Sequence, residues 1–223
     1  MKNQKHKTEL SLCSHEILAY CEMRTENEPD TCALIRKAAT DHPKSHWITG
    51  PIVGSTLQLL IAISNSKQVL DAGTFYGYSA AYMASTNTSV RVTTIDINKQ
   101  YTDQSERFFA NTRLQAQINC QNSSLCDWLH SGSTKFDFVF IDVDKLDIDF
   151  KYKSLIDILT PDGILVMDNA CMRGNVLNPS KPWHVSVDKF SDLAFSDGAV
   201  HSTLLPIRDG LLIVRKGQNR SLV

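Results

Sequence analysis

The sequence lacks several features that mark specialised classes of protein. It has no excess of positive charge, because 23 lysines and arginines are balanced by 24 aspartates and glutamates. Such a chain attracts a phosphate backbone only weakly, which argues against nucleic acid as the main partner. Its richest apolar run, LQLLIAI, is far shorter than the roughly 20 residues that cross a bilayer. We therefore expect no membrane partner.

Signals for export and for metal-binding or disulfide-linked cysteines are also missing. The basic MKNQKHKTEL leads into SLCSHEILAYCEMR, where polar residues interrupt any secretory core. The six cysteines form no CxxC pair, which favours neither a zinc site nor a disulfide framework. These observations predict a cytoplasmic protein.

The length and apolar content are those of an ordinary globular protein. With 223 residues, 42% of them apolar, the chain can bury a substantial core. We predict a single domain over 1–223, with N-terminal helices over about 8–64 and an α/β core over 67–216. Helical spacing of apolar residues in the first part predicts helices over 10–21, 31–39 and 55–63.

Beyond residue 67, short runs rich in β-branched residues alternate with helical segments. This pattern is typical of a parallel sheet that is buried on both faces, and the end of the chain reads as an antiparallel hairpin. We predict an α/β, Rossmann-like doubly wound fold with a mostly parallel, seven-stranded sheet. The predicted strands are 68–72, 91–96, 118–121, 136–142, 163–168, 200–205 and 211–215, and the helices are 79–84, 102–113, 148–159 (closed by TPDG) and 184–195.

The first strand-to-helix turn, VLDAGTFYGYSA, has the features of a nucleoside site. Asp71 ends a buried strand, and glycines follow at 73 and 77. The spacing does not give the three glycines of a dinucleotide fingerprint, which argues against nicotinamide chemistry. Asp96 ends the next strand, where a carboxylate can accept hydrogen bonds from ribose hydroxyls. Singly, each feature fits an ordinary turn or helix cap; together they favour a nucleoside ligand.

A second group of polar residues follows two later strands. FDFVFIDVDK ends in Asp142, Asp144 and Lys145, and GILVMDN ends in Asp168 and Asn169. Oxygen ligands from adjacent strand ends suit a hard divalent cation such as Mg²⁺. A lysine beside a cation and partly removed from water releases its proton more readily, so it can act as a general base. The alternative is that DVDK caps a helix and Lys145 pairs with a carboxylate.

Several separated motifs in register resemble one family. DAGTFYGYSA, TTIDIN, FDFVFIDVDK, MDNACMRG and LLPIRDGLLIVRK are similar to motifs of the cation-dependent O-methyltransferases of the catechol and caffeoyl-CoA type. These are class I S-adenosylmethionine-dependent methyltransferases, and the resemblance runs from about Glu16 to Lys216.

The resemblance implies S-adenosylmethionine and a divalent cation (Mg²⁺, or another such as Mn²⁺ or Ca²⁺) as cofactors, and a homodimer as the default assembly. It also implies roles for particular residues. Lys145 matches the catalytic base, and Arg173 a substrate contact. Asp142, Asp168 and Asn169 match the metal ligands. The matches to cofactor contacts are Thr49, Asp71, Gly73, Thr74, Ser79, Asp96, Ser124, Asp142 and Asp144.

Three departures from the family pattern concern the ligand-binding positions. Ile52 and Val53 replace an acidic residue that many relatives carry before the glycine, which makes that end of the site less polar. Asp71 stands where glutamate is common, so its reach is shorter by one methylene. Arg173 is often asparagine in the plant enzymes, and a cation there favours an acidic acceptor or simply faces solvent.

The sequence therefore predicts methyl transfer to one hydroxyl of a small vicinal-dihydroxy aromatic molecule. Two alternatives stay open. One is a tRNA hydroxyuridine O-methyltransferase, against which the near-neutral charge argues. The other is a non-catalytic S-adenosylmethionine-binding protein, against which the combination of Asp142, Lys145, Asp168 and Asn169 argues.

Overall fold

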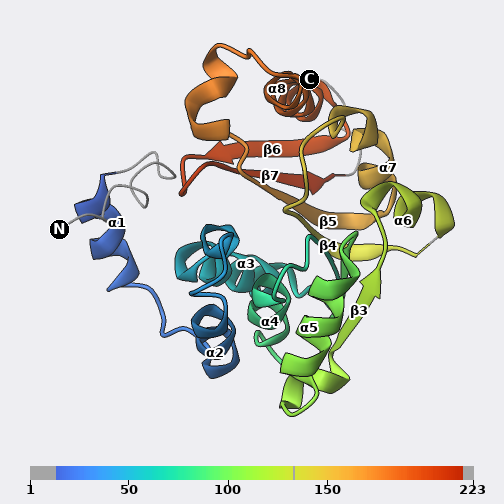
Figure 1. Cartoon of the computed structure of the whole chain (residues 1–223). Coiled ribbons are helices and arrows are strands. Elements are labelled where there is room, and N and C mark those ends of the chain that lie inside the picture. Colours follow the sequence, from blue (N-terminus) through green and yellow to red (C-terminus); the bar gives the residue numbers. More distant parts are fainter. Residues whose placement is uncertain (1–13, 133, 218–223) are drawn as a thin grey trace. The chain divides into compact units, whose positions relative to one another are not determined.

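A computed structural model describes residues 14–132 and 134–217. Their contacts divide the chain into two compact units. We call Glu22–Gly132 the first unit, and Ser133–Val223 together with Met1–Cys21 the second unit. The described residues form seven strands, with parallel pairs and a C-terminal antiparallel hairpin, flanked by helices (Figure 1). This confirms the predicted fold class.

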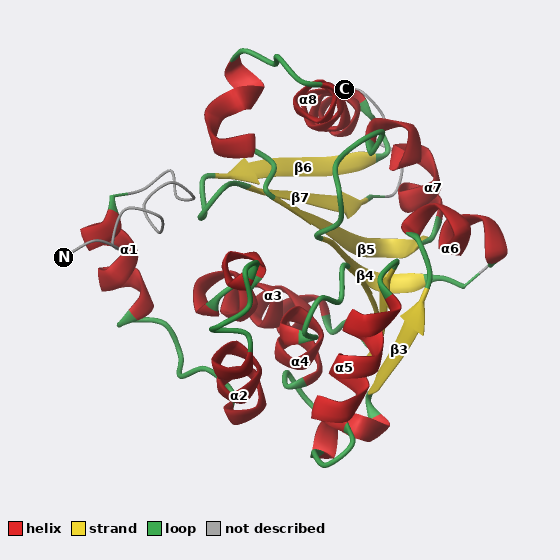
Figure 2. Ribbon diagram, in the orientation of Figure 1, coloured by secondary structure: helices red, strands yellow, loops and turns green. Residues whose placement is uncertain are grey.

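The first unit contains three parallel strands in the order β3-β2-β1. The last four residues of β1 are all buried, as expected for a strand covered on both faces. Helix α5 packs along β3, as Figure 2 shows. The elements are α2 (Asp30–Ala38), η2 (Ser45–Trp47), α3 (Pro51–Ser64), β1 (Gln68–Ala72), α4 (Tyr78–Ala84), β2 (Arg91–Asp96), α5 (Lys99–Phe109), η3 (Arg113–Ala116), β3 (Ile118–Asn122) and α6 (Leu125–Ser131).

Among the described residues, one segment, Ser45–Ser64, has the length and composition that would allow it to cross a membrane, and it contains helix α3. In the structure this segment is not a continuous α-helix, because η2 ends at Trp47 and Gly50 has a φ of 86° before α3 begins. The 14 residues of α3 extend about 21 Å at the usual rise, less than the roughly 30 Å of a bilayer core. Its buried residues pack in the first unit, where Gly54 adjoins the ring of Tyr82 on α4.

In the second unit, the part of the chain that the structure describes forms four strands in the order β4-β5-β7-β6. β4 and β5 are parallel, whereas β7 is antiparallel to both of its neighbours. Helix α8 packs on β6 (Figure 1). The elements are α1 (His15–Glu22), β4 (Phe136–Ile141), η4 (Asp149–Lys151), α7 (Tyr152–Asp157), β5 (Leu159–Asp168), η5 (Met172–Leu177), α8 (Pro182–Ser196), β6 (Val200–Leu205) and β7 (Leu211–Lys216).

The predicted strands match the structure, but some helix predictions were wrong. TPDG does not close a helix: it lies within β5, where the register shifts against β4 and Asp162 has a φ of 64°. The predicted helix 102–113 begins at Lys99 instead, because Asn98 caps it, and ends at Phe109. Helix α6 was missed, although Ser124 and Asp127 form its N-terminal cap. Of the predicted helix 10–21, residues 10–13 lie outside the described residues.

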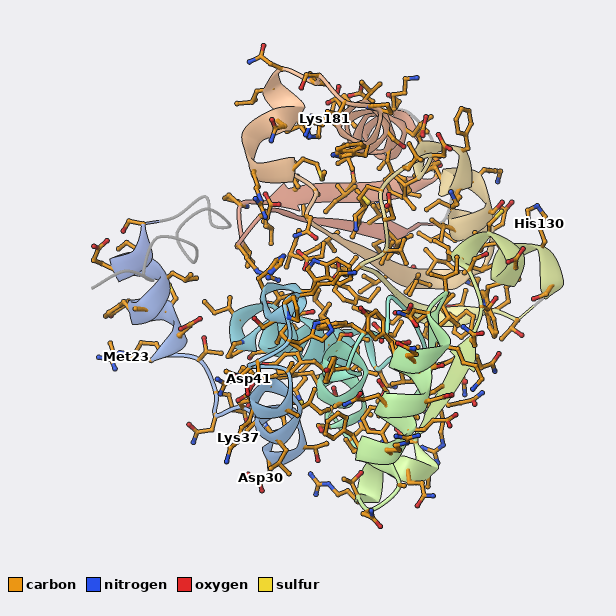
Figure 3. All side chains as sticks on the ribbon, in the orientation of Figure 1. Met23, Asp30, Lys37, Asp41, His130 and Lys181 are labelled. Atoms are coloured by element: carbon orange, nitrogen blue, oxygen red, sulfur yellow. The ribbon has the colours of Figure 1, made fainter. Side chains whose placement is uncertain are left out.

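Charged and polar side chains are exposed on several helices, beside some large apolar ones such as Leu34 and Phe195. Asp30 and Lys37 are exposed on α2, and His130 projects from the end of α6 (Figure 3). The core of each unit is built instead from apolar strand residues such as Leu70 and Phe140, both fully buried.

Candidate active site

The glycine-rich turn of the first unit is tied to the neighbouring strand by a buried hydrogen-bond network. The carboxylate of Asp71 accepts hydrogen bonds from the hydroxyls of Ser79 (3.0 Å) and Thr94 (2.7 Å). The Thr74 hydroxyl in turn lies 2.7 Å from that of Thr94. The structure thus brings together three predicted cofactor residues, Asp71, Thr74 and Ser79. Sequence reasoning missed Thr94, although it lies two residues before Asp96, on the same face of β2.

Asp96 ends β2, as predicted, and holds the turn that follows β1. Its Oδ2 accepts the backbone N–H of Phe75 at 2.9 Å, and its Oδ1 accepts that of Asn98 at 2.8 Å. Left-handed backbone at Phe75 (φ 46°) and Gly77 (φ 78°), with Gly73 at φ 114°, lets the turn pass close to this carboxylate. Asp96 remains half-buried, so water or a ligand can reach it.

Two other predicted cofactor contacts of this unit have different environments. Thr49 is buried at 5% exposure, just before α3. Ser124 caps α6, accepting the N–H of Asp127 at 3.0 Å and donating to its carboxylate. Its hydroxyl therefore has a structural role here. Of the two residues that depart from the family pattern, Val53 is buried in the core and Ile52 is half-buried.

Sequence reasoning did not find an aromatic cluster around the same turn. The ring of Phe75 lies 5.3 Å from that of His42, 5.6 Å from Trp47 and 5.0 Å from Tyr101, measured between centroids. All three contacts are edge-to-face, a favourable geometry for aromatic rings. They connect the segment before α3 and the start of α5 to the glycine-rich turn.

The second group of predicted residues lies in the second unit, where parallel β4 and β5 end side by side. The register pairs Ile141 with Met167, so Asp142 and Asp168 occupy adjacent strand ends. Lys145 is buried, and its Nζ lies 3.8 Å from Oδ1 of Asp142 while it donates to the carbonyl of Val143 at 2.9 Å. The predicted base and a predicted metal ligand are therefore brought together.

Asp168 is fully buried, and its two carboxylate oxygens differ. Oδ1 accepts the backbone N–H of Asn169 at 2.8 Å, whereas Oδ2 has no hydrogen-bond partner among the described residues. Oδ2 forms a longer ion pair with Nη1 of Arg208, at 3.5 Å. Burial and the neighbouring charge of Asp142 raise the pKa of Asp168 to about 7, although Arg208 and Lys145 oppose the shift.

These residues fit a hard divalent cation. A buried carboxylate oxygen without a hydrogen-bond donor is costly unless a positive charge compensates it. Asn169, the third predicted ligand, has left-handed backbone (φ 59°), which asparagine tolerates better than most residues. The described residues contain no cluster of three or more histidine, cysteine, aspartate or glutamate side chains that could hold a metal. The predicted metal ligands are of a different kind, because they combine two carboxylates (Asp142 and Asp168) with the amide of Asn169.

The remaining predicted residues of this unit lie in turns. Asp144 is exposed and accepts the N–H of Leu146 at 2.8 Å within a turn. The alternative that DVDK caps a helix was wrong, because the next helix, η4, begins only at Asp149 and has no side-chain cap. Arg173 is exposed in the loop after Asn169, and its backbone N–H donates to Oδ1 of buried Asp209 at 2.6 Å. Sequence reasoning assigned PIRDG only to a turn and so missed Arg208 and Asp209. No local motif marks these two residues. They come close to the end of β5 because β7, which follows the turn, pairs with β5.

Comparison with solved structures defines the class of protein first. A SAH-bound methyltransferase of Podospora anserina superposes with a TM-score of 0.83 at 22% identity, over 91% of this chain and 94% of that one. The O-methyltransferase from Streptomyces achromogenes that is involved in tomaymycin synthesis, solved with SAM, gives 0.80 at 21% identity, over 91% and 96%. The fold is therefore that of the methyltransferases.

Sequence comparison then gives the family. The sequence model of the O-methyltransferase family matches residues 22–217. A probable caffeoyl-CoA O-methyltransferase of Dictyostelium discoideum is 31% identical over 171 residues, 73% of this chain and 74% of that protein. A caffeoyl-CoA O-methyltransferase of Stellaria longipes is 27% identical over 199 residues, 82% and 81% of the two chains. This chain belongs to the O-methyltransferase family and is an enzyme of that kind.

Proposed function

We propose that this enzyme transfers a methyl group from S-adenosylmethionine to one hydroxyl of a vicinal-dihydroxy aromatic molecule, with the help of a divalent cation. The observation that carries the cation is the buried Oδ2 of Asp168, which lacks a hydrogen-bond donor among the described residues. Lys145 lies at the same strand ends, 3.8 Å from Asp142. Family membership and the names of the relatives support the acceptor class.

The chain's own residues have separate tasks in this proposal. The donor supplies an electrophilic methyl group on a sulfonium, and the cation favours ionisation of the acceptor hydroxyl. In the first unit, Asp96 and the turn after β1 would hold the ribose and the rest of the nucleoside. In the second unit, Asp142, Asp168 and Asn169 would hold the cation. Lys145 would accept the hydroxyl proton at Nζ, so that the oxygen gains the methyl carbon as the sulfonium loses it.

Arg173 would contribute to the choice of acceptor. Its side chain is exposed, while Asp209 fixes its backbone N–H and hence the base of that side chain. A guanidinium binds carboxylates and phosphates well, so we propose that acidic vicinal diols are favoured. We also propose, as the sequence predicts, that the enzyme is a homodimer and works in the cytoplasm.

The test is a methyl-transfer assay with isotopically labelled S-adenosylmethionine. Catechols, hydroxycinnamoyl esters and tRNA would be offered, each with Mg²⁺ and with excess chelator. We expect label in vicinal diols only, loss of transfer on chelation and recovery on returning Mg²⁺. Full activity without a cation would place the enzyme in a metal-independent class. Label in tRNA alone would give the acceptor as RNA, and calorimetric binding of the donor without any product would indicate a non-catalytic binding protein.

A further inference from the structure

Arg208 has an unusual backbone conformation beside the proposed cation ligands. It lies in the turn between β6 and β7, with a φ of 54°, in the left-handed region that residues other than glycine rarely adopt. Such strain persists only where the surroundings hold it, and it is frequent at functional sites. The register pairs Asp168 with Leu211, so this turn returns to the end of β5.

The guanidinium of Arg208 adjoins the one oxygen of Asp168 that the protein leaves without a hydrogen bond. Nη1 is 3.5 Å from Oδ2, whereas Oδ1 is occupied by the N–H of Asn169 at 2.8 Å. Charge-assisted hydrogen bonds measure about 2.7–2.9 Å, so the contact at 3.5 Å is an ion pair without a good hydrogen bond. Arg208 thus offsets part of the charge of Oδ2 from a short distance, without forming a good hydrogen bond to it.

The second unit also places its own cations beside these strand ends. Asp142 has Lys145 at 3.8 Å, and Asp168 has Arg208 at 3.5 Å. A third carboxylate, that of buried Asp209, interacts electrostatically with the same two cations. A divalent cation held by Asp142 and Asp168 would lie close to the guanidinium of Arg208, and like charges in a buried site repel strongly.

We propose that Arg208 is an internal cation that competes with the divalent cation for Oδ2 of Asp168 and thereby weakens cation binding. This inference rests on the proposed function, since it assumes that Asp142, Asp168 and Asn169 bind the cation. Arg208 offsets part of the charge of Asp168 in the cation-free protein. The same positive charge raises the concentration of divalent cation that is needed to fill the site.

The test measures binding of Mn²⁺ alone, without donor or acceptor, from the spin-resonance signal of the free ion. R208Q removes the charge and keeps a side chain of similar length. We expect its dissociation constant for Mn²⁺ to be about tenfold lower than that of the wild type, a conservative value for loss of a like charge at this range. R208K keeps the charge and should stay nearer to the wild type. The control is R215Q, which removes an exposed surface arginine paired with Asp162 and should leave the constant unchanged.

A melting experiment gives a second readout that needs no activity. In excess chelator, R208Q should melt below the wild type, because Asp168 then keeps a buried charge without its partner. Added Mn²⁺ should raise the melting temperature of R208Q by more than that of the wild type. If R208Q fails to fold, R208G serves instead, since glycine adopts a φ of 54° without strain.

The outcomes separate this inference from the proposed function. Suppose that the wild type binds Mn²⁺ and that D168N abolishes this binding. If R208Q then binds Mn²⁺ no more tightly than the wild type, the proposed competition is overturned, but the proposed cation site stands. If neither the wild type nor the variant binds Mn²⁺, both proposals fall. Tighter binding in R208Q but not in R215Q supports the competition.

Discussion

At the scale of single residues, Asp168 has the most demanding environment. It is fully buried at the end of β5, close enough to Asp142 for that charge to raise its pKa. The opposing charges of Arg208 and Lys145 do not cancel the effect of burial, and the pKa rises to about 7. Charged Asp168 is thus a cost to the folded protein that a bound cation would relieve.

This cost predicts how the stability of the cation-free enzyme depends on pH. The folded-state pKa of about 7 lies above the ordinary 3.8, so the favourable contribution of Asp168 is complete below about pH 4 and is lost as the pH rises through 7. In chelator, the urea midpoint of the wild type should fall between pH 5 and pH 8. D168N should show a flatter profile over that range. If the wild type and D168N depend on pH in the same way, the folded protein does not disfavour the ionised form of Asp168.

Lys145 gives a prediction about turnover. K145A removes the proposed proton acceptor, so kcat should fall by about 10²- to 10⁴-fold, the usual contribution of a general base. Donor affinity, measured by calorimetry, should change little. The matched control is K153A, which removes an exposed lysine paired with Asp157 and should keep full activity. Unchanged turnover in K145A would reject its role as base.

At the scale of secondary-structure elements, the β6–β7 turn holds the loop that follows Asn169. The N–H groups of Ala170 and Cys171 donate to the carbonyls of Gly210 (3.0 Å) and Asp209 (2.8 Å). Asp209 also accepts from Arg173. A side chain at Gly210 would meet Sγ of Cys171 at 2.5 Å, so the two segments are in close contact. Left-handed backbone at Asn169 and Arg173 is maintained by these bonds.

D209A should therefore destabilise the enzyme and disturb this loop. It leaves the part-buried N–H of Arg173 without its acceptor, and loss of a typical hydrogen bond costs about 0.5–1.5 kcal/mol. D209N keeps an oxygen at that place and should recover most of the loss. Both would be measured by urea unfolding of the cation-free protein. Equal effects of the two substitutions would show that the negative charge matters rather than the acceptor.

The contact between α3 and α4 gives a second prediction at this scale. A Cβ at Gly54 would lie 2.5 Å from the ring of Tyr82, so the helices approach as closely as glycine allows. G54A should lower the free energy of unfolding by about 1–3 kcal/mol, the usual cost of overpacking a core. G198A is the control, because its Cβ would have nothing within 4 Å. Comparable losses in both would exclude close packing as the cause.

At the scale of the whole molecule, the residues proposed to bind the nucleoside and those proposed to bind the cation belong to different units. Asp96 belongs to the first unit, and Asp142 and Asp168 belong to the second. Nucleoside binding and cation binding should therefore be separable by mutation, although methyl transfer requires both.

D96A should weaken binding of S-adenosylhomocysteine by about ten- to a hundredfold, the range expected for lost hydrogen bonds to a charged group. Its affinity for Mn²⁺ should be that of the wild type. D168N should show the reverse pattern. Calorimetry with each ligand alone gives both affinities, and loss of both ligands in either variant would mean that the substitution disrupts the fold instead of one site.

The sequence by itself determined the strands, the doubly wound fold class and the family. Strands such as 68–72 and 91–96 were predictable because short runs rich in apolar and β-branched residues alternate with helical segments there. The sequence also placed Asp142 and Lys145 at the end of one strand, and in the structure they lie 3.8 Å apart.

Only the tertiary structure decided how those residues are supported. The ion pair of Arg208 with Asp168 joins positions 40 residues apart, through the antiparallel pairing of β5 with β7. The clustering of Phe75 with His42 and Tyr101, and the insertion of TPDG within β5, likewise depend on which segments pack together. Local propensity does not determine such long-range contacts, because they form only where the register of the strands and the burial of neighbouring side chains bring distant segments to the same place.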